Sequence, residues 1–283
     1  MQSTTKNMLL RGAGLVVLLL TLLGIFAVAL RKDESFLKQN RTPMVAASRT
    51  AGQEFELGLE ALKNDDFDRA LARFSDSIRL DPANALAFYY RGGILCARAD
   101  YDKALADLTE SIRLDPQNGR AFVARATVHS QQKNHDLAIS DLSEAILLAP
   151  DDAVSFNNRA FVHRQKHDYD QAIADYSEAI RLNPQLGAPL GGLAWILATC
   201  PKDNARDGQK AVELATQACE ISDWNDRIEL ETLAAAFAEC GDFPAAIKWQ
   251  QQALAMLHGD PDRVEEGRRR LTLYETGQPF RDE

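Results

Sequence analysis

The hexamer "SIRLDP" occurs twice in this chain, ending at Pro82 and at Pro116. Looser copies, "AILLAP" and "AIRLNP", end at Pro150 and Pro184, so that successive copies are 34 residues apart. A fixed register over four copies is not expected by chance, and it indicates that the interval is one structural unit used repeatedly. This internal repeat constrains the fold more than any other feature of the sequence.

Each interval has the pattern of two helices joined by a short turn. Apolar residues recur at i, i+3, i+4 and i+7 in two blocks, which is typical of amphipathic helices. Segments such as "NDDFD" and "RADYD" separate the blocks, and each second block stops just before the proline, which disfavours helix for its predecessor. The sequence therefore predicts four regular helical hairpins, repeats 1 to 4: residues 51–84, 85–118, 119–152 and 153–186.

Small side chains, which let neighbouring helices approach closely, recur at three positions of this frame. The three columns are Gly58, Gly92, Ala126 and Ala160; Ala70, Ala104, Ala138 and Ala172; and Ser77, Ser111, Ala145 and Ala179. Together with the terminal proline and an aromatic residue at the turn (Phe67, Tyr101 and Tyr169), this pattern resembles the tetratricopeptide repeat. The resemblance implies an all-α fold, an α-solenoid of helical hairpins wound into a right-handed superhelix.

Two degenerate repeats, repeats 5 and 6, occupy residues 187–258. Repeat 5 fits the frame only with five extra residues in the turn around "PKDNARDG", and both repeats lack the closing proline. Residues 259–283 are predicted to form a capping helix and tail, in which the amphipathic stretch 261–276 covers the exposed face of the final hairpin. This section looks like that of membrane-anchored bacterial repeat proteins. The small positions here are Ala194, Ala211, Ala218, Ala234, Ala246 and Ala253.

The amino-terminal segment has the composition of a membrane anchor. Residues 12–30 form an uncharged run, close to the roughly 20 residues that a helix needs to cross a bilayer. We interpret this run as a transmembrane helix between a short tail, residues 1–11, and a polar stalk, residues 31–50. A cleavable signal peptide is the alternative, because a basic leader precedes the run and Ala27-Val28-Ala29 fits a cleavage site.

The flanking charges and the position of the anchor predict opposite orientations. Four basic residues within 31–41 outnumber Lys6 and Arg11, which would keep the large domain in the cytoplasm. Long domains, however, translocate largely regardless of flanking charge. An anchor so close to the amino terminus commonly exports the domain on its carboxyl-terminal side, so we expect a single-pass protein with an extracytoplasmic domain.

Charge and motif content argue against several classes of function. The formal net charge of −9 offers no basic stripe to a phosphate backbone, so nucleic-acid binding is not expected. The chain has no H-E-x-x-H or G-x-S-x-G motif, and Gly191-Gly192 lacks the lysine and hydroxyl residue of a phosphate-binding loop. We therefore predict no catalytic residue, no metal ligand and no cofactor, and we do not expect an enzyme.

In repeats 2 to 4, one position of the first helix is an arginine and one position of the second helix is an aspartate. The repeats that lack this arginine also lack the aspartate. An anion-binding arginine stripe is one interpretation, but the shared presence and absence favour structural pairs, since a guanidinium presents a fork that a carboxylate matches. The residues, each sixteen apart, are Arg91 with Asp107, Arg125 with Asp141, and Arg159 with Asp175.

Four histidines, His129, His135, His163 and His167, could in principle converge on a zinc ion. Simpler explanations exist for each of them. His135 replaces the turn aromatic, His167 lies near a helix carboxyl end where a cationic imidazole is favoured, and the other two share an inward column. The four cysteines lack a C-x-x-C pair. Cys200 and Cys240 are predicted to be free buried thiols, because adjacent helices lie ~8 to 10 Å apart, which is too far for a disulfide.

The resemblance also implies where a partner would bind, because the first helices of a tetratricopeptide solenoid line a concave groove. The corresponding residues here are Phe55, Leu59, Tyr89, Gly93, Arg120, Val123, Thr127, Asn157, Phe161, Arg164 and Trp195. We expect a membrane-tethered scaffold whose groove binds a peptide or helix of another protein. The alternatives are a noncatalytic accessory subunit of an envelope enzyme or assembly complex, and a metal or small-ligand binder that uses the histidines.

Overall fold

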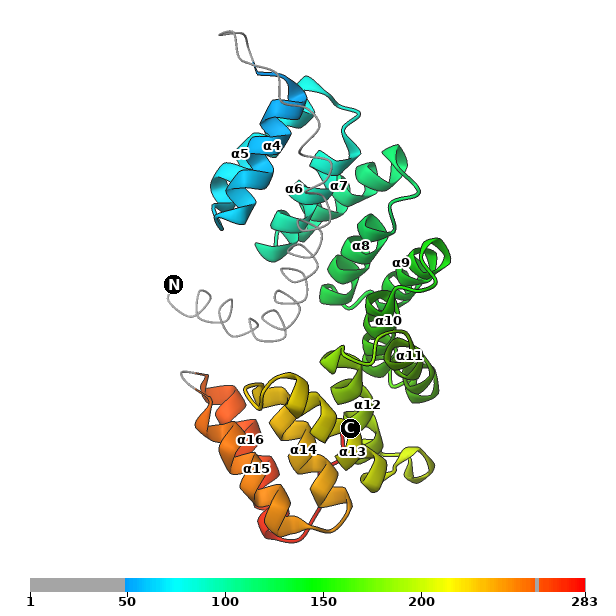
Figure 1. The fold of residues 1–283 in the computed structure, drawn as a ribbon, viewed down its shortest axis with the longest axis vertical. Coiled ribbons are helices and arrows are strands. Elements are labelled where there is room, and N and C mark those ends of the chain that lie inside the picture. Colours follow the sequence, from blue (N-terminus) through cyan, green and yellow to red (C-terminus); the bar gives the residue numbers. More distant parts are fainter. Residues whose placement is uncertain (1–48, 258–259, 283) are drawn as a thin grey trace. The chain divides into compact units, whose positions relative to one another are not determined.

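The computed structural model describes residues 49–257 and 260–282 (Figure 1). These residues form thirteen α-helices, one short 3-10 helix and no β-strand, which confirms the all-α fold. The α-helices are α4 (Ala51–Lys63), α5 (Phe67–Leu80), α6 (Ala85–Ala97), α7 (Tyr101–Leu114), α8 (Gly119–Gln131), α9 (His135–Leu148), α10 (Ala153–Gln165), α11 (Tyr169–Leu182), α12 (Gly187–Thr199), α13 (Gly208–Ile221), α14 (Arg227–Glu239), α15 (Phe243–Ala255) and α16 (Pro261–Glu275).

The helix boundaries agree with the 34-residue frame, and local side-chain chemistry explains them. Thr50 begins α4 with a capping box, in which its hydroxyl accepts from the Gln53 N–H and the Gln53 side chain accepts from the Thr50 N–H. Asn84 caps α6 by accepting a backbone N–H of the first turn at 3.1 Å. α5 ends at Leu80, just ahead of Pro82, and the second helices of repeats 2 to 4 end at the same frame position.

The small columns lie at the helix crossings inside each hairpin. Their alanines and serines are all at most 1% exposed. In repeats 1 and 2 the serines also bind across the hairpin, because Ser77 Oγ donates to the Ala51 carbonyl and Ser111 Oγ to the Ala85 carbonyl, each at 2.9 Å. The start of the first helix is thereby tied to the second helix.

The described residues divide into two compact units. The amino-terminal unit ends at Leu148 and contains α4 to α9, whereas the carboxyl-terminal unit begins at Ala149 and contains α10 to α16. In the first unit the core includes the rings of Phe74 and Tyr90, which stack with centroids 5.5 Å apart. In the second unit the core includes Tyr176, which is 2% exposed. Figure 1 shows the hairpins of each unit packed side by side.

Repeat 5 differs from the regular repeats in the connection between its helices. Residues 200–207 join α12 to α13, whereas residues 64–66 are enough in repeat 1, in agreement with the insertion expected there. Arg206 holds this longer connection, because its Nε donates to Glu239 of α14 and its Nη1 to the Cys200 carbonyl, each at 2.8 Å. The insertion is therefore bound to repeat 6 by specific contacts.

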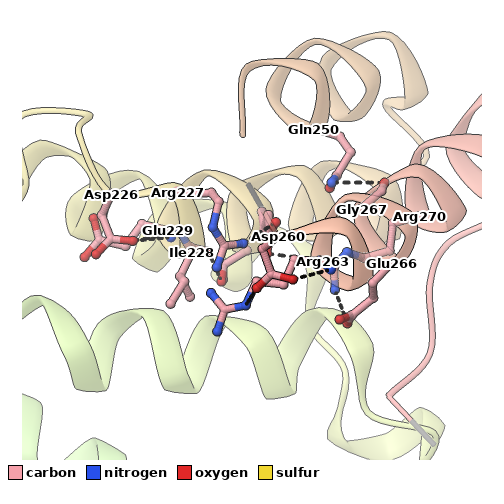
Figure 2. A network of polar contacts seen from close by, with 12 residues as sticks. Asp226, Arg227, Ile228, Glu229, Gln250, Asp260, Arg263, Glu266, Gly267 and Arg270 are labelled. Carbon is pink, nitrogen blue, oxygen red and sulfur yellow. Dashed lines mark hydrogen bonds and ion pairs between the residues drawn. The ribbon is translucent and has the colours of Figure 1, made fainter. Parts of the chain in front are cut away.

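Helix α16 covers the last hairpin, as expected of a solenoid cap. Figure 2 shows Gln250 of α15, whose Nε2 donates to the Gly267 carbonyl of α16 at 3.2 Å. Arg270 of α16 lies 2.9 Å from Glu266 and 3.0 Å from Glu231 of α14. Arg270 and Glu231 are only 5% and 6% exposed, so this ion pair holds α16 against α14 in a largely dry environment.

The predicted transmembrane anchor, residues 12–30, lies outside the described residues. Within residues 49–257 and 260–282, no helix combines the length and the apolar character that a membrane crossing requires. The anchor therefore stays a prediction from the sequence.

The turn inside most hairpins contains a residue in the left-handed region. Asp65, Ala99, Lys133 and His167 have φ values of 55°, 59°, 62° and 61°, whereas repeat 6 has Gly241 with a φ of 78°. A side chain in this region costs about 1 kcal/mol, which glycine avoids. We expect Ala99→Gly to raise the free energy of unfolding by about 0.5 to 1 kcal/mol and Gly241→Ala to lower it by a similar amount, measured by urea denaturation.

The control for this pair is Ala106→Gly, at an exposed position inside α7. There glycine gains no left-handed conformation and should cost about 0.5 to 1 kcal/mol. If Ala99→Gly destabilises the chain as much as Ala106→Gly does, the turn residues are not strained.

Candidate functional site

The predicted Arg–Asp pairs are present in all three repeats that carry the two columns. In repeat 2, Arg91 donates through Nε and Nη2 to the two carboxylate oxygens of Asp107, at 2.7 and 2.8 Å. Such bidentate, charge-assisted hydrogen bonds fix both side chains. The structural interpretation of the two columns is therefore confirmed. The same geometry, with distances of 2.7 to 2.9 Å, recurs in Arg125–Asp141 and Arg159–Asp175.

The guanidinium groups of these pairs have further partners. Arg91 Nη1 donates to Ser75 Oγ on the preceding hairpin at 3.1 Å, and its guanidinium carbon lies 5.7 Å from the centroid of the Phe88 ring. The hydrogen bond to Asp141 raises the pKa of Arg125 further above its already high value. The aspartates are 6% to 7% exposed. These arginines thus stabilise the hairpins and do not form an anion-binding stripe.

Repeat 1 contains an ion pair that the two columns did not predict. Arg73 of α5 donates through Nη1 to Glu54 of α4 at 2.9 Å, and Glu54 is 6% exposed. Here the acid is on the first helix and the arginine on the second, so the polarity of the pair is reversed. The two residues are 19 apart in the sequence, whereas the other pairs are 16 apart, and the constant spacing could not identify them.

The four described histidines are not grouped as metal ligands. His129 Nε2 lies 3.9 Å from Asp141, and His163 Nδ1 lies 3.7 Å from Asp168. Burial lowers the pKa of His129, so the neutral imidazole is favoured there. In the part of the chain that the structure describes, no three histidine, cysteine or acidic side chains are grouped so that they could hold a metal ion. The metal-binding alternative therefore has no support from these residues.

The cysteines are free thiols, but one of them is not buried. Cys96, Cys200 and Cys219 are buried, and burial raises the pKa of Cys96 and of Cys219 to about 12. Cys240 is exposed. It lies directly after the last residue of α14, where the chain leaves the helix and its packed face. The prediction of a buried thiol was wrong for Cys240.

In the amino-terminal unit, the first predicted groove positions mainly support the core. Leu59 and Tyr89 are 4% and 2% exposed. The ring of Phe55 packs 5.7 Å from that of Phe74 and 5.8 Å from that of Tyr90. Leu59 and Tyr89 therefore offer little surface to a partner, whereas Phe55 is half-buried.

The third repeat contributes a mixture of covered and accessible groove positions. Val123 and Thr127 are 7% and 8% exposed, and Thr127 Oγ1 donates to the Val123 carbonyl at 3.0 Å. Gly93, in the repeat before, is also buried. Arg120, at the start of α8, is exposed.

Three of the predicted positions lie on one face of α10 in the carboxyl-terminal unit. We call Asn157, Phe161 and Arg164 the α10 patch; all three are half-buried. The guanidinium carbon of Arg164 lies 5.4 Å from the centroid of the Phe161 ring. The Asn157 amide donates to Asn158 Oδ1 at 3.2 Å. The patch thus combines an aromatic ring, a cation and an amide within about two helical turns.

Trp195 of α12, the last predicted position, contacts a segment that the sequence did not place. This segment, the carboxyl-terminal tail, comprises residues 277–282. Trp195 Nε1 donates to Asp282 Oδ2 at 2.7 Å, and its ring lies 5.8 Å from that of Phe280. The sequence signals available were Gly277 and Pro279, which end a helix but do not say where the chain goes next.

Comparison with known proteins gives the family. A family model described as "Tetratricopeptide repeat" matches residues 55–118 and 96–153, and a second with the same description matches residues 153–186. Together with the hairpins and the small columns, these matches show that the chain is a tetratricopeptide repeat protein. None of the curated proteins compared with it matches. Proteins of this family act as protein–protein interaction scaffolds.

Several solved structures share the fold at low sequence identity. PilW, described as a type IV pilus biogenesis factor, is 17% identical, with 77% of this chain and all of that chain covered and a TM-score of 0.66. A tetratricopeptide repeat protein from Parabacteroides merdae is 15% identical, with 80% and 87% covered and a TM-score of 0.64. MamA from Desulfovibrio magneticus is 20% identical, with 64% and 99% covered and a TM-score of 0.55.

The Arg125–Asp141 pair gives a testable prediction about stability. Arg125→Leu leaves the nearly buried carboxylate of Asp141 without its two hydrogen-bond donors. It should lower the free energy of unfolding by about 1 to 3 kcal/mol. The double change with Asp141→Leu removes the unpaired charge and should recover much of this loss. Thermal or urea denaturation of both single variants and the double variant measures the coupling.

The control for this cycle is Arg181→Leu with Glu178→Leu, an exposed pair on α11. Its coupling should be much smaller than that of Arg125 and Asp141, because solvent screens both exposed side chains. Strictly additive losses at Arg125 and Asp141 would show that the pair does not act as a unit.

Proposed function

We propose that this protein is a scaffold that holds an extended peptide or a helix of a partner protein against the α10 patch. The family is generally noncatalytic, and the patch offers binding chemistry without a nucleophile or an acid–base pair. The observation that carries the proposal is the contrast between two arginines of α10. Arg159 is held by Asp175, whereas no described carboxylate lies within ion-pair distance of Arg164.

Each residue of the patch suits a different part of a peptide ligand. An asparagine amide can both donate to and accept from a partner backbone. A partly exposed aromatic ring gives contact area of the kind that dominates interface energies. The Arg164 guanidinium has no described carboxylate within ion-pair distance and can bind one from the partner, and Phe161 fixes its position through the cation–π contact.

We further propose that residues 12–30 tether this scaffold to a membrane, with the repeats on the extracytoplasmic side. The length of the uncharged apolar run supports the tether, and long domains translocate largely regardless of flanking charge. A tethered scaffold meets its partners at the membrane surface, where a modest affinity of a single groove is enough to bind them.

The binding proposal is tested by Asn157→Ala and Arg164→Ala. Each should change the free energy of unfolding by no more than about 0.5 kcal/mol, because the side chains are partly exposed. Together they should weaken binding of the partner by at least about tenfold, measured with a purified partner first identified by capture from native membranes. The matched control is Arg181→Ala, at an exposed arginine of α11, which should leave binding unchanged. Undiminished binding by the folded double variant would place the partner elsewhere on the solenoid.

The tether is tested by deleting residues 1–32. The full chain should sediment with membranes and resist a high-salt wash, and the deleted form should be soluble, because the apolar run is missing. Added protease should digest the repeats of the full chain in cells with a permeabilised outer layer and an intact inner membrane. Full protection of the repeats would mean that they face the cytoplasm.

A further inference from the structure

The carboxyl-terminal tail leaves α16 by a defined turn. Gly277 has a φ of 72°, and its N–H donates to the Tyr274 carbonyl at 3.1 Å. The Gln278 N–H donates to the Leu273 carbonyl at 2.8 Å. These bonds end the helix with glycine in the left-handed conformation, and Pro279 prevents its continuation. The chain then returns to α12, as the red segment in Figure 1 shows.

Phe280 of the tail completes an aromatic enclosure around a buried cation. The guanidinium carbon of Arg270 lies 5.7 Å from the centroid of the Trp195 ring and 5.7 Å from that of Phe280. The two rings lie 5.8 Å apart. Arg270 is itself held by Glu231 at 3.0 Å. Trp195 and Arg270 therefore present an aromatic face and a cation to the ring of Phe280.

Arg281 and Asp282 make polar contacts with separate elements of the unit. Arg281 Nη1 lies 2.8 Å from Glu239 Oε2 of α14, and it donates to the Ala198 carbonyl at 3.4 Å. The Asp282 side chain accepts from Trp195 Nε1 at 2.7 Å. The cation of Arg281 thus pairs with the Glu239 carboxylate, and the carboxylate of Asp282 accepts a hydrogen bond from the Trp195 indole.

The backbone of Asp282 is bound on both sides. Its N–H donates to the Thr199 carbonyl at 3.0 Å, and its own carbonyl accepts from the Tyr169 hydroxyl at 3.3 Å. Main-chain bonds combined with side-chain contacts are how proteins hold extended peptides. The tail is therefore bound in the manner of a peptide ligand, by residues of α11, α12, α14 and α16.

We propose that this surface, the Trp195 site, is a second peptide-recognition site and that the tail occupies it in place of a partner. The site consists of Tyr169, Trp195, Glu231, Glu239 and Arg270. Its ligand is an extended segment of a partner protein with an aromatic residue, an arginine and an acidic residue in succession, the order of Phe280, Arg281 and Asp282. This inference rests on the proposed function as a peptide-binding scaffold and adds the chemistry of the ligand and a competitor within the chain.

Competition by the tail has a predictable size. A segment joined to its site by a short connection has an effective concentration of about a millimolar. A separate peptide of the same sequence must therefore compete with the tail in the full chain. Weakening the tail should expose the site without altering the residues that line it.

The test uses the full chain and a fluorescent peptide of residues 276–282 with both ends blocked. Phe280→Ala combined with Asp282→Ala removes the aromatic and acidic contacts of the tail. This variant should bind the peptide at least about tenfold more tightly than the unaltered chain, measured by fluorescence anisotropy. A peptide carrying the same two alanines is the matched control and should not bind. Adding Trp195→Phe to the variant keeps a ring but removes the N–H donor, and should weaken binding by about tenfold.

A second variant separates an opened site from a damaged fold. Arg281→Glu places an acid beside Glu239 and should release the tail while leaving Phe280 unchanged. Circular dichroism and thermal melting report whether each variant is folded. The proposal is overturned if the folded variants bind the peptide no better than the unaltered chain, because the tail is then only part of the cap. The assay requires no partner and no residue of the α10 patch, so its failure would leave the proposed function standing.

Discussion

Close contact between the two helices of each hairpin is the constraint on which the rest of this structure depends. At Gly58 of α4, a side-chain carbon would lie 2.6 Å from the ring of Phe74 on α5, and at Gly92 of α6 it would lie 2.8 Å from Leu108 on α7. Such distances are far below a van der Waals contact, so the helices can approach only where the crossing residue is small. The buried alanines of the other columns fulfil the same requirement with a single methyl group.

This fixed approach explains why the arginine and aspartate columns can pair in a constant geometry. Once the crossing is set, a residue on the first helix always faces the residue sixteen positions later on the second, and a guanidinium has the reach to bind it with two hydrogen bonds. Where the columns change, the contact changes in kind. In repeat 6 the aspartate position holds Trp249, which stacks on Trp224 with centroids 5.0 Å apart. The aromatic stack therefore joins α15 to the connection between α13 and α14, whereas the ion pairs join the two helices of one hairpin.

The same contacts separate structural side chains from those that remain available. Ion pairs with aspartates hold the side chains of Arg91, Arg125 and Arg159. Arg164 contacts the Phe161 ring, no described carboxylate lies within ion-pair distance of it, and we propose that it binds a partner. Trp195 occupies a predicted groove position of the repeat, but it contacts Phe280 and Asp282 of the tail. The contacts of these side chains therefore differ in kind, because the three arginines make ion pairs whereas Arg164 and Trp195 contact aromatic rings.

The sequence by itself determined the helical hairpins, the small columns and the Arg–Asp pairs, because each depends on contacts at a fixed spacing that every regular repeat displays again. It did not determine the Arg73–Glu54 pair, the exposure of Cys240 or the covering of Leu59 and Tyr89, since these depend on neighbours outside the constant spacing. The tail is the clearest case. Its contact between Trp195 and Asp282 joins residues 87 apart and has no periodic signal. Only the tertiary structure, through the turn at Gly277 and the packing of α12 on α14 and of α16 on α15, decided where the tail binds.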